Sequence, residues 1–430
     1  MARNRVIYQS QALFIAPNST GIQVSGSGVA NPQSATYTTG ELASGTSLLY
    51  KLDRVQNCNF NFTINRQDIN ELGQLARIDS IVNDTPTVGL DFSYYVTDGL
   101  NERLMGFNFS GKSLATDTAV VTDASAISGL MVDTQGNNYY IVTVDEGEDV
   151  VNANLSVTSN SIVGVGNGFI TEYSLEASVG SIPTASITVE GFNIKSDVDR
   201  KANLDNGTYV LTGSSPAIDY SQTPATRLTG TNRRYAINTG NLTTGVSTVA
   251  ALRPGDIVLT MPVNDGFTEL DNALNKAHVQ SFAFTIPLTR TVLQRLGNVF
   301  GFARVLEVPL NMDITISAIV NELQDADIFD QLCGSAGKKD FTVTLNKCAD
   351  VGEAITPKLV YNIRGAILNS ESFSTDIGGN QTVDLTYNVQ IGGANDTTNG
   401  IFMSGSYTTG NAMTLLMLTG FYKLGTAKNY

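Results

Sequence analysis

The sequence predicts a mainly β protein of two tandem domains, each a β-sandwich or partial barrel of antiparallel strands with one short flanking α-helix. Three observations lead to this prediction. Short segments alternate between apolar and polar residues, as strands with one buried face do. Loops rich in Gly, Ser, Thr and Asn separate these segments, and the first half of the chain resembles the second half. The 430 residues, 42% of them hydrophobic, provide enough material for two packed cores.

The similarity between the halves is clearest when residues 55–73 are aligned with residues 279–297. Six of these nineteen positions are identical without a gap, where composition alone gives roughly one. The identical pairs are Val55/Val279, Gln56/Gln280, Phe60/Phe284, Arg66/Arg290, Leu72/Leu296 and Gly73/Gly297. We interpret the match as an internal duplication.

The repeated unit begins with a strand. Residues 58–64 and 282–288 alternate between apolar and other side chains, which places four apolar side chains of each copy on one face. These are Cys58, Phe60, Phe62 and Ile64 in the first copy, and Phe282, Phe284, Ile286 and Leu288 in the second. A second strand is expected at residues 88–96 and, in the second copy, at 312–320.

Between these two strands the spacing of apolar residues changes to that of a helix. The residues concerned are Ile69, Leu72 and Leu75 in one copy, and Leu293, Leu296 and Phe300 in the other. Asn65 and Thr289, at equivalent positions, are suitable N-caps. The sequence therefore predicts a strand–helix–strand unit in each copy.

Each copy continues with a variable segment and closing strands. Residues 139–144 resemble 340–345, residues 173–179 match 361–367, and residues 187–189 match 383–385. The variable segment covers about residues 97–170 in the first copy and 321–358 in the second. Because Gly, Ser, Thr and Asp dominate its first version, we expect a surface insertion there.

Short strands are also expected before each repeated unit. Residues 6–15 and 47–52 precede the first unit, and residues 209–212 and 256–260 precede the second. The expected domains are therefore residues 1–200, with the insertion at about 97–170, and residues 201–430.

Composition limits the function. The 26 Lys and Arg against 40 Asp and Glu give a net charge of −14, which argues against a protein that grips nucleic acid or an anionic membrane. No apolar run reaches the roughly 18 residues of a membrane span, so membrane insertion is not expected. Residues 1–17 lack the apolar core of a signal peptide, so the chain is expected to stay where it is made.

Candidate catalytic residues are few. His278 is the single histidine, and no Cys or acidic residue is arranged around it as a triad. Residues 164–168 and 334–339 are rich in glycine but lack the spacing of a phosphate loop, so a turn and a flexible loop are expected. Paired carboxylates for glycoside hydrolysis remain an alternative, but the chain has no tryptophan to form a sugar-binding platform and no two acids stand out. We predict no catalytic and no cofactor-binding residue, and no enzymatic activity.

Metal and cysteine chemistry give weak signals. Asp325, Asp327 and Asp330 favour a solvated helix start over a calcium site, since the glycine and distal glutamate of a calcium loop are missing. The acidic run at residues 145–149 favours a charged hairpin tip. The cysteines are expected to be buried free thiols, and a Cys333–Cys348 disulfide remains the alternative to Cys58, Cys333 and Cys348 all being free. No metal ligand is predicted.

Self-assembly is the function that the residues favour. A β protein with few charges and many strands has unpaired strand edges, which are either protected or used to join another subunit. Two similar units in one chain can occupy equivalent positions in a closed ring. Such a role needs no catalytic residue.

Four stretches carry a family resemblance: residues 3–14, the unit at residues 55–97, residues 173–191 and the second copy of the unit. In these stretches the sequence resembles the major tail tube proteins of long-tailed bacteriophages. The resemblance implies two packed antiparallel sheets per domain, domains that close into rings of six, and rings that stack into a tube through which the genome enters the host. A chain with two such domains is similar to the fused type, in which three chains form a pseudo-six-fold ring; a six-chain ring is the alternative.

The expected function is accordingly that of a structural virion protein of the tail tube. Its partners would be further copies of itself in trimeric pseudo-six-fold rings, other tail proteins, and double-stranded DNA in transient, non-specific passage. A negative lumen would let DNA slide. The expected location is the tail of the virion, after synthesis in the host cytoplasm. The alternative is another virion surface protein: a capsid decoration, baseplate or adhesin component.

Overall fold

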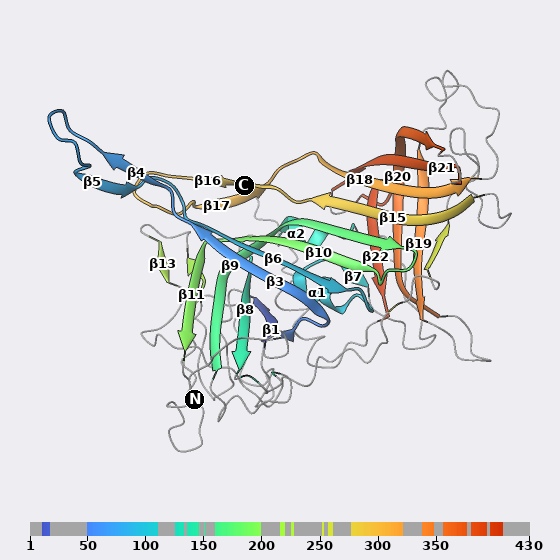
Figure 1. Cartoon of the computed structure of the whole chain (residues 1–430), viewed down its shortest axis with the longest axis horizontal. Coiled ribbons are helices and arrows are strands. Elements are labelled where there is room, and N and C mark those ends of the chain that lie inside the picture. The colour runs from blue at the N-terminus through green and yellow to red at the C-terminus, as the bar shows by residue number, and fades with distance from the viewer. Residues whose placement is uncertain are drawn as a thin grey trace, which may run out of the picture.

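The structure is a computed structural model that describes residues 11–17, 50–110, 125–132, 136–144, 146, 150, 160–198, 216–219, 225–227, 252, 257–260, 277–320, 338–347, 356–375, 380–393 and 396–406. These residues form a mainly β protein, as the sequence predicts (Figure 1). Two short helices, α1 (Leu100–Met105) and α2 (Ser128–Val132), are the helical segments of this described part. Neither is long and apolar enough to cross a membrane.

The described residues of the first copy form eleven strands. They are β1 (Gln11–Pro17), β2 (Tyr50–Lys51), β3 (Val55–Thr63), β4 (Arg66–Ile69), β5 (Asp79–Val82), β6 (Thr87–Tyr95), β7 (Phe109–Ser110), β8 (Asn137–Val144), β9 (Asn160–Ser178), β10 (Thr184–Gly191) and β11 (Asn193–Val198). The expected boundary at residue 200 lies outside the described residues.

The second copy repeats much of this order. After the small pair β12 (Ile218–Asp219) and β13 (Thr226–Arg227) come β14 (Ile257–Thr260), β15 (Ala277–Pro287), β16 (Arg290–Leu293), β17 (Ala303–Leu306), β18 (Leu310–Val320), β19 (Lys339–Lys347), β20 (Thr356–Ser374), β21 (Thr382–Ile391) and β22 (Gly400–Gly405). Strands β15 to β18 correspond to β3 to β6, and β19, β20 and β21 correspond to β8, β9 and β10.

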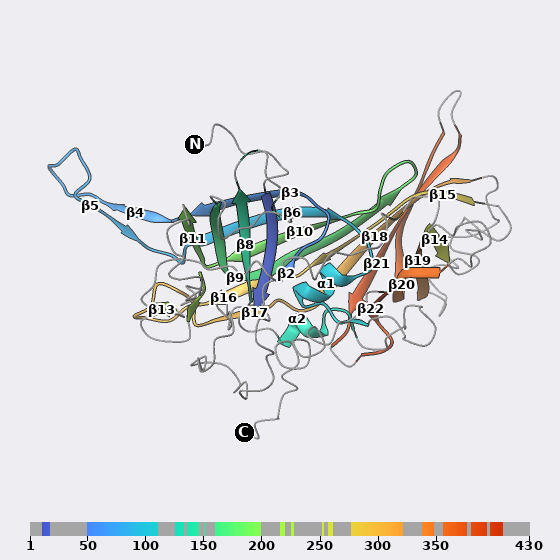
Figure 2. The ribbon, with the colours of Figure 1, turned by 90° about the horizontal axis from the view of Figure 1, so that it is seen from below.

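One sheet runs through both copies. Its strands follow the order β3-β6-β10-β9-β15-β18-β21-β20, and all neighbours are antiparallel. Each copy adds a second sheet around the other half of its long strand: β2-β1-β8-β9-β11 in the first, and β14-β19-β20-β22 in the second. Figure 2 shows β1, β8 and β11 crossing the layer of β3, β6 and β10. The two-sheet unit is the sandwich-like arrangement that the sequence predicts.

The long strand β9 changes sheets at a bend that the sequence predicts as a turn. Asn167 has a left-handed backbone (φ 53°), its N–H donates to Oδ1 of Asn138 (3.3 Å), and its Oδ1 accepts the N–H of Ile218 (2.7 Å). A Cβ on Gly168 would lie 2.8 Å from the ring of Tyr139. The turn expected at residues 164–168 is therefore wrong: these residues are a bent strand whose glycines allow close packing.

The helix predicted in each repeated unit is also wrong. Residues 66–82 and 290–306 form two-stranded hairpins, β4–β5 and β16–β17, with matching bounds. Gly73 and Gly297 have left-handed backbones (φ 94° and 86°), which interrupt a helix. The expected N-caps instead close the roots of the hairpins, where the carbonyls of Asn65 and Thr289 accept the N–H groups of Asn83 and Glu307. A segment this short has no intrinsic helical stability when its apolar residues find no partner.

The expected surface insertion is partly a core element. Leu104, Met105, Phe107, Phe109 and Ile127 are buried among the side chains of both copies. Strand β7 pairs in parallel with β22 of the second copy. These large apolar side chains pack between the two copies. The free energy gained by burying them outweighs the preference of the surrounding polar sequence for a surface loop. The prediction of a surface position is wrong for these five residues, whereas Glu146 of the same segment is exposed.

The register of the closing strands differs from the sequence alignment. In both copies the long strand skips one residue against its partner, at Glu172/Ile170 opposite Thr188/Val189 and at Ser370/Leu368 opposite Thr386/Tyr387. Leu175 therefore corresponds to Phe373, and Phe169 to Ile367; Tyr361, which the alignment matches with Tyr173, pairs with β19 instead. Alternation repeats every two residues, so it cannot fix the register of a strand.

Candidate assembly surfaces

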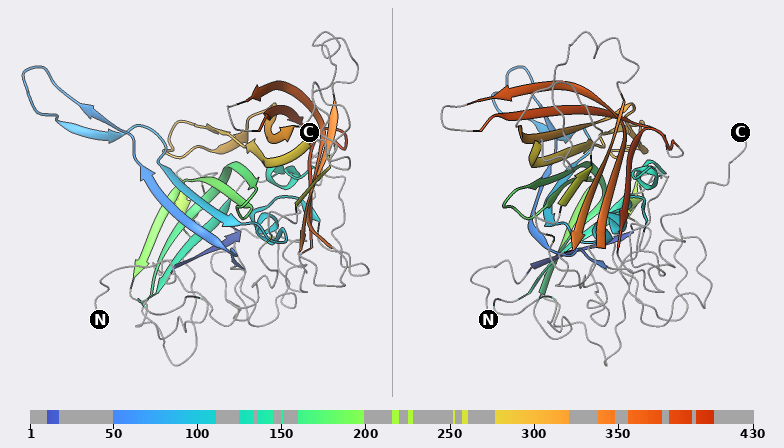
Figure 3. Two further views of the ribbon diagram at one scale, coloured as in Figure 1. Left: turned by 45° about the vertical axis from the view of Figure 1, so that its right-hand side comes forward. Right: turned by 90° about the vertical axis from the view of Figure 1, so that its right-hand side faces the viewer.

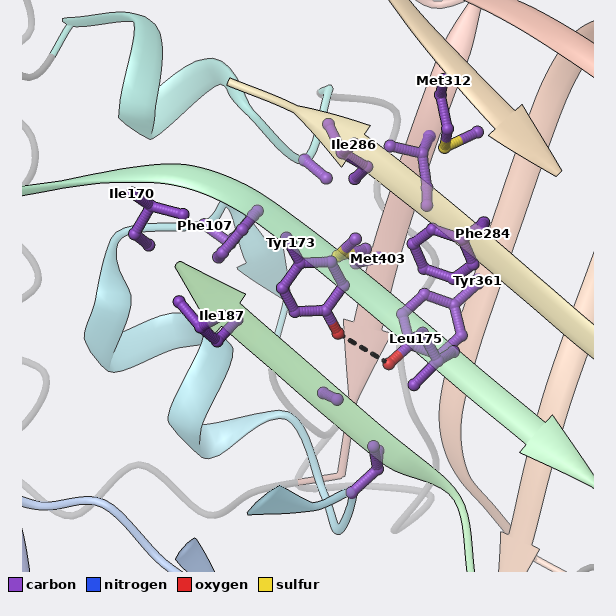
Figure 4. Packing of buried hydrophobic residues seen from close by; sticks show 14 of the residues in the cluster. Phe107, Ile170, Tyr173, Leu175, Ile187, Phe284, Ile286, Met312, Tyr361 and Met403 are labelled. Carbon is purple, nitrogen blue, oxygen red and sulfur yellow. Dashed lines mark hydrogen bonds between the residues drawn. The ribbon is translucent and has the colours of Figure 1, made fainter. Parts of the chain in front are cut away.

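The two copies are joined inside the chain by strand pairing. Strand β9 pairs with β15, with Leu175 opposite Phe284 and Tyr173 opposite Ile286. These four side chains are buried in one core that extends through both copies (Figure 4). The first copy contributes β3, β6, β10 and β9 to the continuous sheet, and the second copy contributes β15, β18, β21 and β20. At the joint, β9 of the first copy lies next to β15 of the second.

A buried polar cluster lies beside this joint. Glu102 of α1 accepts hydrogen bonds at Oε1 from the hydroxyls of Tyr94 (2.7 Å) and Tyr173 (3.3 Å). The Tyr173 hydroxyl lies 3.5 Å from that of Tyr361, the contact drawn dashed in Figure 4. Glu102 thus belongs to the first copy while Tyr361 belongs to the second, and the network spans the joint.

Burial shifts the protonation of this cluster. Loss of hydration raises the pKa of Glu102 to about 7, and the tyrosine hydroxyl donors oppose that rise. Loss of hydration also raises the pKa values of Tyr94, Tyr173 and Tyr361 well above their usual range. The three phenols therefore stay neutral donors at physiological pH, and Glu102 is the titrating group of the cluster.

We expect Glu102→Gln to flatten the dependence of stability on pH. The folded pKa of about 7 lies above the ordinary glutamate pKa of 4.5, so the folded state holds its proton to higher pH than the unfolded chain does. The stability from this group is complete below pH 4.5, falls by about 1 kcal/mol per pH unit as pH rises, and levels off above pH 7. Urea unfolding from pH 4 to 8 should show this slope in the wild type and a smaller one in Glu102→Gln. Glu176→Gln, on the exposed face of β9, controls for the lost charge; an unchanged slope in Glu102→Gln would contradict the assignment.

The strand equivalent to β15 is an uncovered edge. In β3 the apolar face predicted from the sequence is present, since Phe60 lies opposite Leu90 and Phe62 opposite Val88. Phe60 is nevertheless 45% and Phe62 61% exposed, whereas their counterparts Phe284 and Ile286 are buried. The difference arises because β9 covers β15 and nothing in the described chain covers β3.

The strand equivalent to β9 is uncovered in the same way. Among the described residues, the carboxyl-terminal half of β20 pairs with β21 along one edge and with no strand along the other. There Phe373, the counterpart of the buried Leu175, is 40% exposed. The continuous sheet of the described residues therefore ends with β3 at one edge and β20 at the other. The internal joint pairs their counterparts: β15 is the second-copy counterpart of β3, and β9 is the first-copy counterpart of β20.

The hairpins carry a further exposed surface, which we call the arm stripes. Both arms present apolar side chains at five matched positions: Ile69/Leu293, Leu72/Leu296, Leu75/Val299, Ile78/Phe302 and Ile81/Val305, all exposed. The spacing that suggested a buried helical face is thus an outward face of each hairpin. Large exposed apolar patches mark interaction surfaces.

The remaining sequence candidates behave as isolated residues where they are described. His278 is exposed in β15, and Cys58 is a half-buried free thiol whose pKa rises to about 12 because of burial and the nearby Asp91. No group of three or more His, Cys, Asp or Glu side chains that could hold a metal occurs in the described ranges. Cys333, Cys348, the aspartates at 325, 327 and 330, and most of residues 145–149 and 334–339 lie outside the described residues.

Sequence reasoning missed Glu102 and the outward arms. A single acid between Leu100 and Leu104 was the available signal for a buried carboxyl group. Comparison of the sequence with protein-family models and with curated proteins gives no match.

Proposed function

We propose that this chain is a structural protein that assembles head to tail into closed rings, through pairing of β3 of one protomer with β20 of the next. The observation that carries the proposal is the internal joint. It shows these two kinds of strand edge already paired, and the chain repeats both edges at its ends with exposed apolar side chains.

The joint supplies an expected register. Phe284 lies opposite Leu175, and Ala283 lies opposite Glu176. The counterparts of these pairs are Phe60 opposite Phe373, and Asn59 opposite Ser374. Two phenylalanines that are each exposed in the single chain would then cover one another.

The same operation that relates the two copies within a chain would relate neighbouring chains. A heterologous contact of this kind closes into a ring when its rotation divides a full turn. Because each chain contributes two similar units, three chains give a pseudo-six-fold ring. A six-chain ring is the alternative stoichiometry.

The arm stripes support stacking of rings. Strand pairing leaves both stripes uncovered, and they recur at each repeated unit, so every unit of a ring would present one. A regular array of apolar surfaces around a ring suits a second ring laid on the first.

Stacked rings make a tube, and the resemblance to tail tube proteins gives that tube its proposed role as the conduit for phage genome delivery. The protein would then reside in the virion tail after synthesis in the host cytoplasm, together with other tail proteins. The net charge of −14 supports passage of double-stranded DNA without tight binding. The role is mechanical, so we propose no enzymatic activity, metal or cofactor.

Negative-stain electron microscopy and light scattering across a concentration series test the function. We expect rings or hollow tubes with three chains per layer. Six chains per layer would retain the tube and overturn the pseudo-six-fold ring. Monomers at every concentration, also when seeded with phage tail tips, would favour a capsid decoration, baseplate or adhesin protein.

A further inference from the structure

The second-copy arm, β16–β17, is docked on the first copy. Arg304 pairs with Glu190 (Nη2 to Oε1 2.5 Å), and Arg290 lies over the ring of Phe169 (Cζ to centroid 5.0 Å). Arg290 also donates to the carbonyl of Leu130 (2.6 Å). Both guanidinium groups are buried beneath the arm, so this is a packed contact.

A second contact lies nearer the tip of the arm. Nε2 of Gln294 donates to Oδ1 of Asp84 (2.6 Å), and the hydroxyl of Thr85 donates to the carbonyl of Val299 (2.9 Å). The arm is therefore seated on the first copy at two places, one near its root and one near its tip.

The first-copy arm, β4–β5, has the same structure without a seat. The N–H of Ile78 donates to the carbonyl of Ile69, as that of Phe302 donates to Leu293. All residues from 59 to 79 are exposed. The arm projects from the left of Figure 1, and the left panel of Figure 3 shows it pointing away from the rest of the ribbon.

The second copy carries the matching seat without an arm. Ile367, the counterpart of Phe169, is 50% exposed, whereas Phe169 is buried under the docked arm. Val308, the counterpart of Asp84, is 73% exposed. Two large apolar side chains are thus exposed at the two positions where the internal arm makes its root and tip contacts.

We propose that the β4–β5 arm of one protomer lies across the second copy of the next protomer, from Ile367 to Val308, with Arg66 in the place of Arg290. The inference rests on the proposed pairing of β3 with β20, because that pairing brings the root of the arm to this face. Inside the chain the N–H of Leu288, where β15 leads into its arm, donates to the carbonyl of Thr171 in β9 (2.8 Å).

The charges of the free arm and the vacant seat agree with this contact. In the free arm, Ser80 is the counterpart of Arg304. In the seat, Asn388 is the counterpart of Glu190, because Asn388 lies opposite Ile367 just as Glu190 lies opposite Phe169. The ion pair of the docked arm is thus replaced on both sides by neutral residues. The charged group of the seat beside this position is Asp313, whose Oδ1 accepts a hydrogen bond from Nδ2 of Asn388 (2.8 Å) and whose negative charge complements that of Arg66.

The substitution Ile367→Phe tests the placement by gain of affinity. It places at residue 367 an aromatic ring equivalent to that of Phe169, over which Arg290 lies. Arg66 would then acquire a cation–π contact. We expect the dissociation constant between protomers, measured by sedimentation velocity across a concentration series, to fall roughly threefold or more. In an Arg66→Ala background the same substitution should give no gain. An equal gain in both backgrounds would overturn the placement of the arm.

Two further variants separate the arm from the ring. Ile367→Lys, at a side chain exposed in the single chain, should weaken association about tenfold by placing a second cation against Arg66 under the arm. Val258→Lys, at an exposed apolar residue of β14 away from the seat, is the matched control and should have no effect. Wild-type assembly with an unaffected Ile367→Lys variant would overturn the arm contact alone. A wild type that never associates would overturn the proposed function and the arm contact together.

Discussion

We expect Phe60→Asp to abolish the proposed assembly and to leave the single chain folded. Phe60 is 45% exposed in the chain, so the substitution should cost its fold only about 1 kcal/mol. In the proposed joint it lies against Phe373, where a carboxylate would be buried without a partner. A buried unpaired charge costs about 3–5 kcal/mol, which weakens each contact about 100- to 4,000-fold. Light scattering should therefore show monomers at concentrations where the wild type forms rings.

The control is Asn59→Asp, which adds the same charge to the neighbouring residue of β3 on its other face. It should assemble, because in the internal joint the counterpart Ala283 is half-buried and Glu176 opposite it is exposed, so a carboxylate there keeps contact with solvent. Thermal unfolding of both variants should coincide with that of the wild type within a few degrees. Rings formed by Phe60→Asp at wild-type concentrations would contradict the pairing of β3 with β20.

Tyr173→Ala should be the most destabilising single substitution near the internal joint. Tyr173 is fully buried, its ring lies 4.9 Å from that of Phe107 and 5.9 Å from that of Phe284, and its hydroxyl serves Glu102. Truncation leaves a cavity where the copies meet and is expected to lower the free energy of unfolding by about 3–5 kcal/mol. Equilibrium denaturation in urea measures this loss.

Tyr173→Phe separates the ring from the hydroxyl. The ring contacts persist while Glu102 loses one donor and keeps Tyr94, so we expect a loss of about 1 kcal/mol. If Tyr173→Ala and Tyr173→Phe had equal stability, the whole loss would come from the hydroxyl and its polar cluster. The ring packing would then contribute little, which would contradict a tightly packed joint.

The strands, the faces of the strands and the duplication follow from local sequence. Alternation places Phe60 and Phe62 on one face in any fold that makes β3 a strand, because successive side chains point to opposite sides. The match of Gly73 with Gly297 likewise marks equivalent turns wherever the copies lie. These properties depend on residues close in the chain, which is why sequence reasoning could reach them.

Several features depend on contacts between residues far apart in the chain. The spacing of three residues from Ile69 to Leu75 suits a helix, but a glycine in the left-handed region and antiparallel pairing with residues 79–82 make a hairpin. Alternation allows any even shift, so the register of β20 required the paired strand. The burial of Glu102 required the second copy, whose Tyr361 completes its surroundings.

The candidate surfaces divide along the same line. The apolar face of β3 can be read from its residues, but its exposure cannot, because β15 has the same pattern and is buried. The connection between the copies decides which of two similar edges is paired inside the chain. It lets β9 pair with β15 and leaves β3 and β20 at the two edges of the sheet. Local sequence specifies what each edge can bind, and the tertiary pairing decides which edges remain available, because each strand edge can hydrogen-bond only one neighbour.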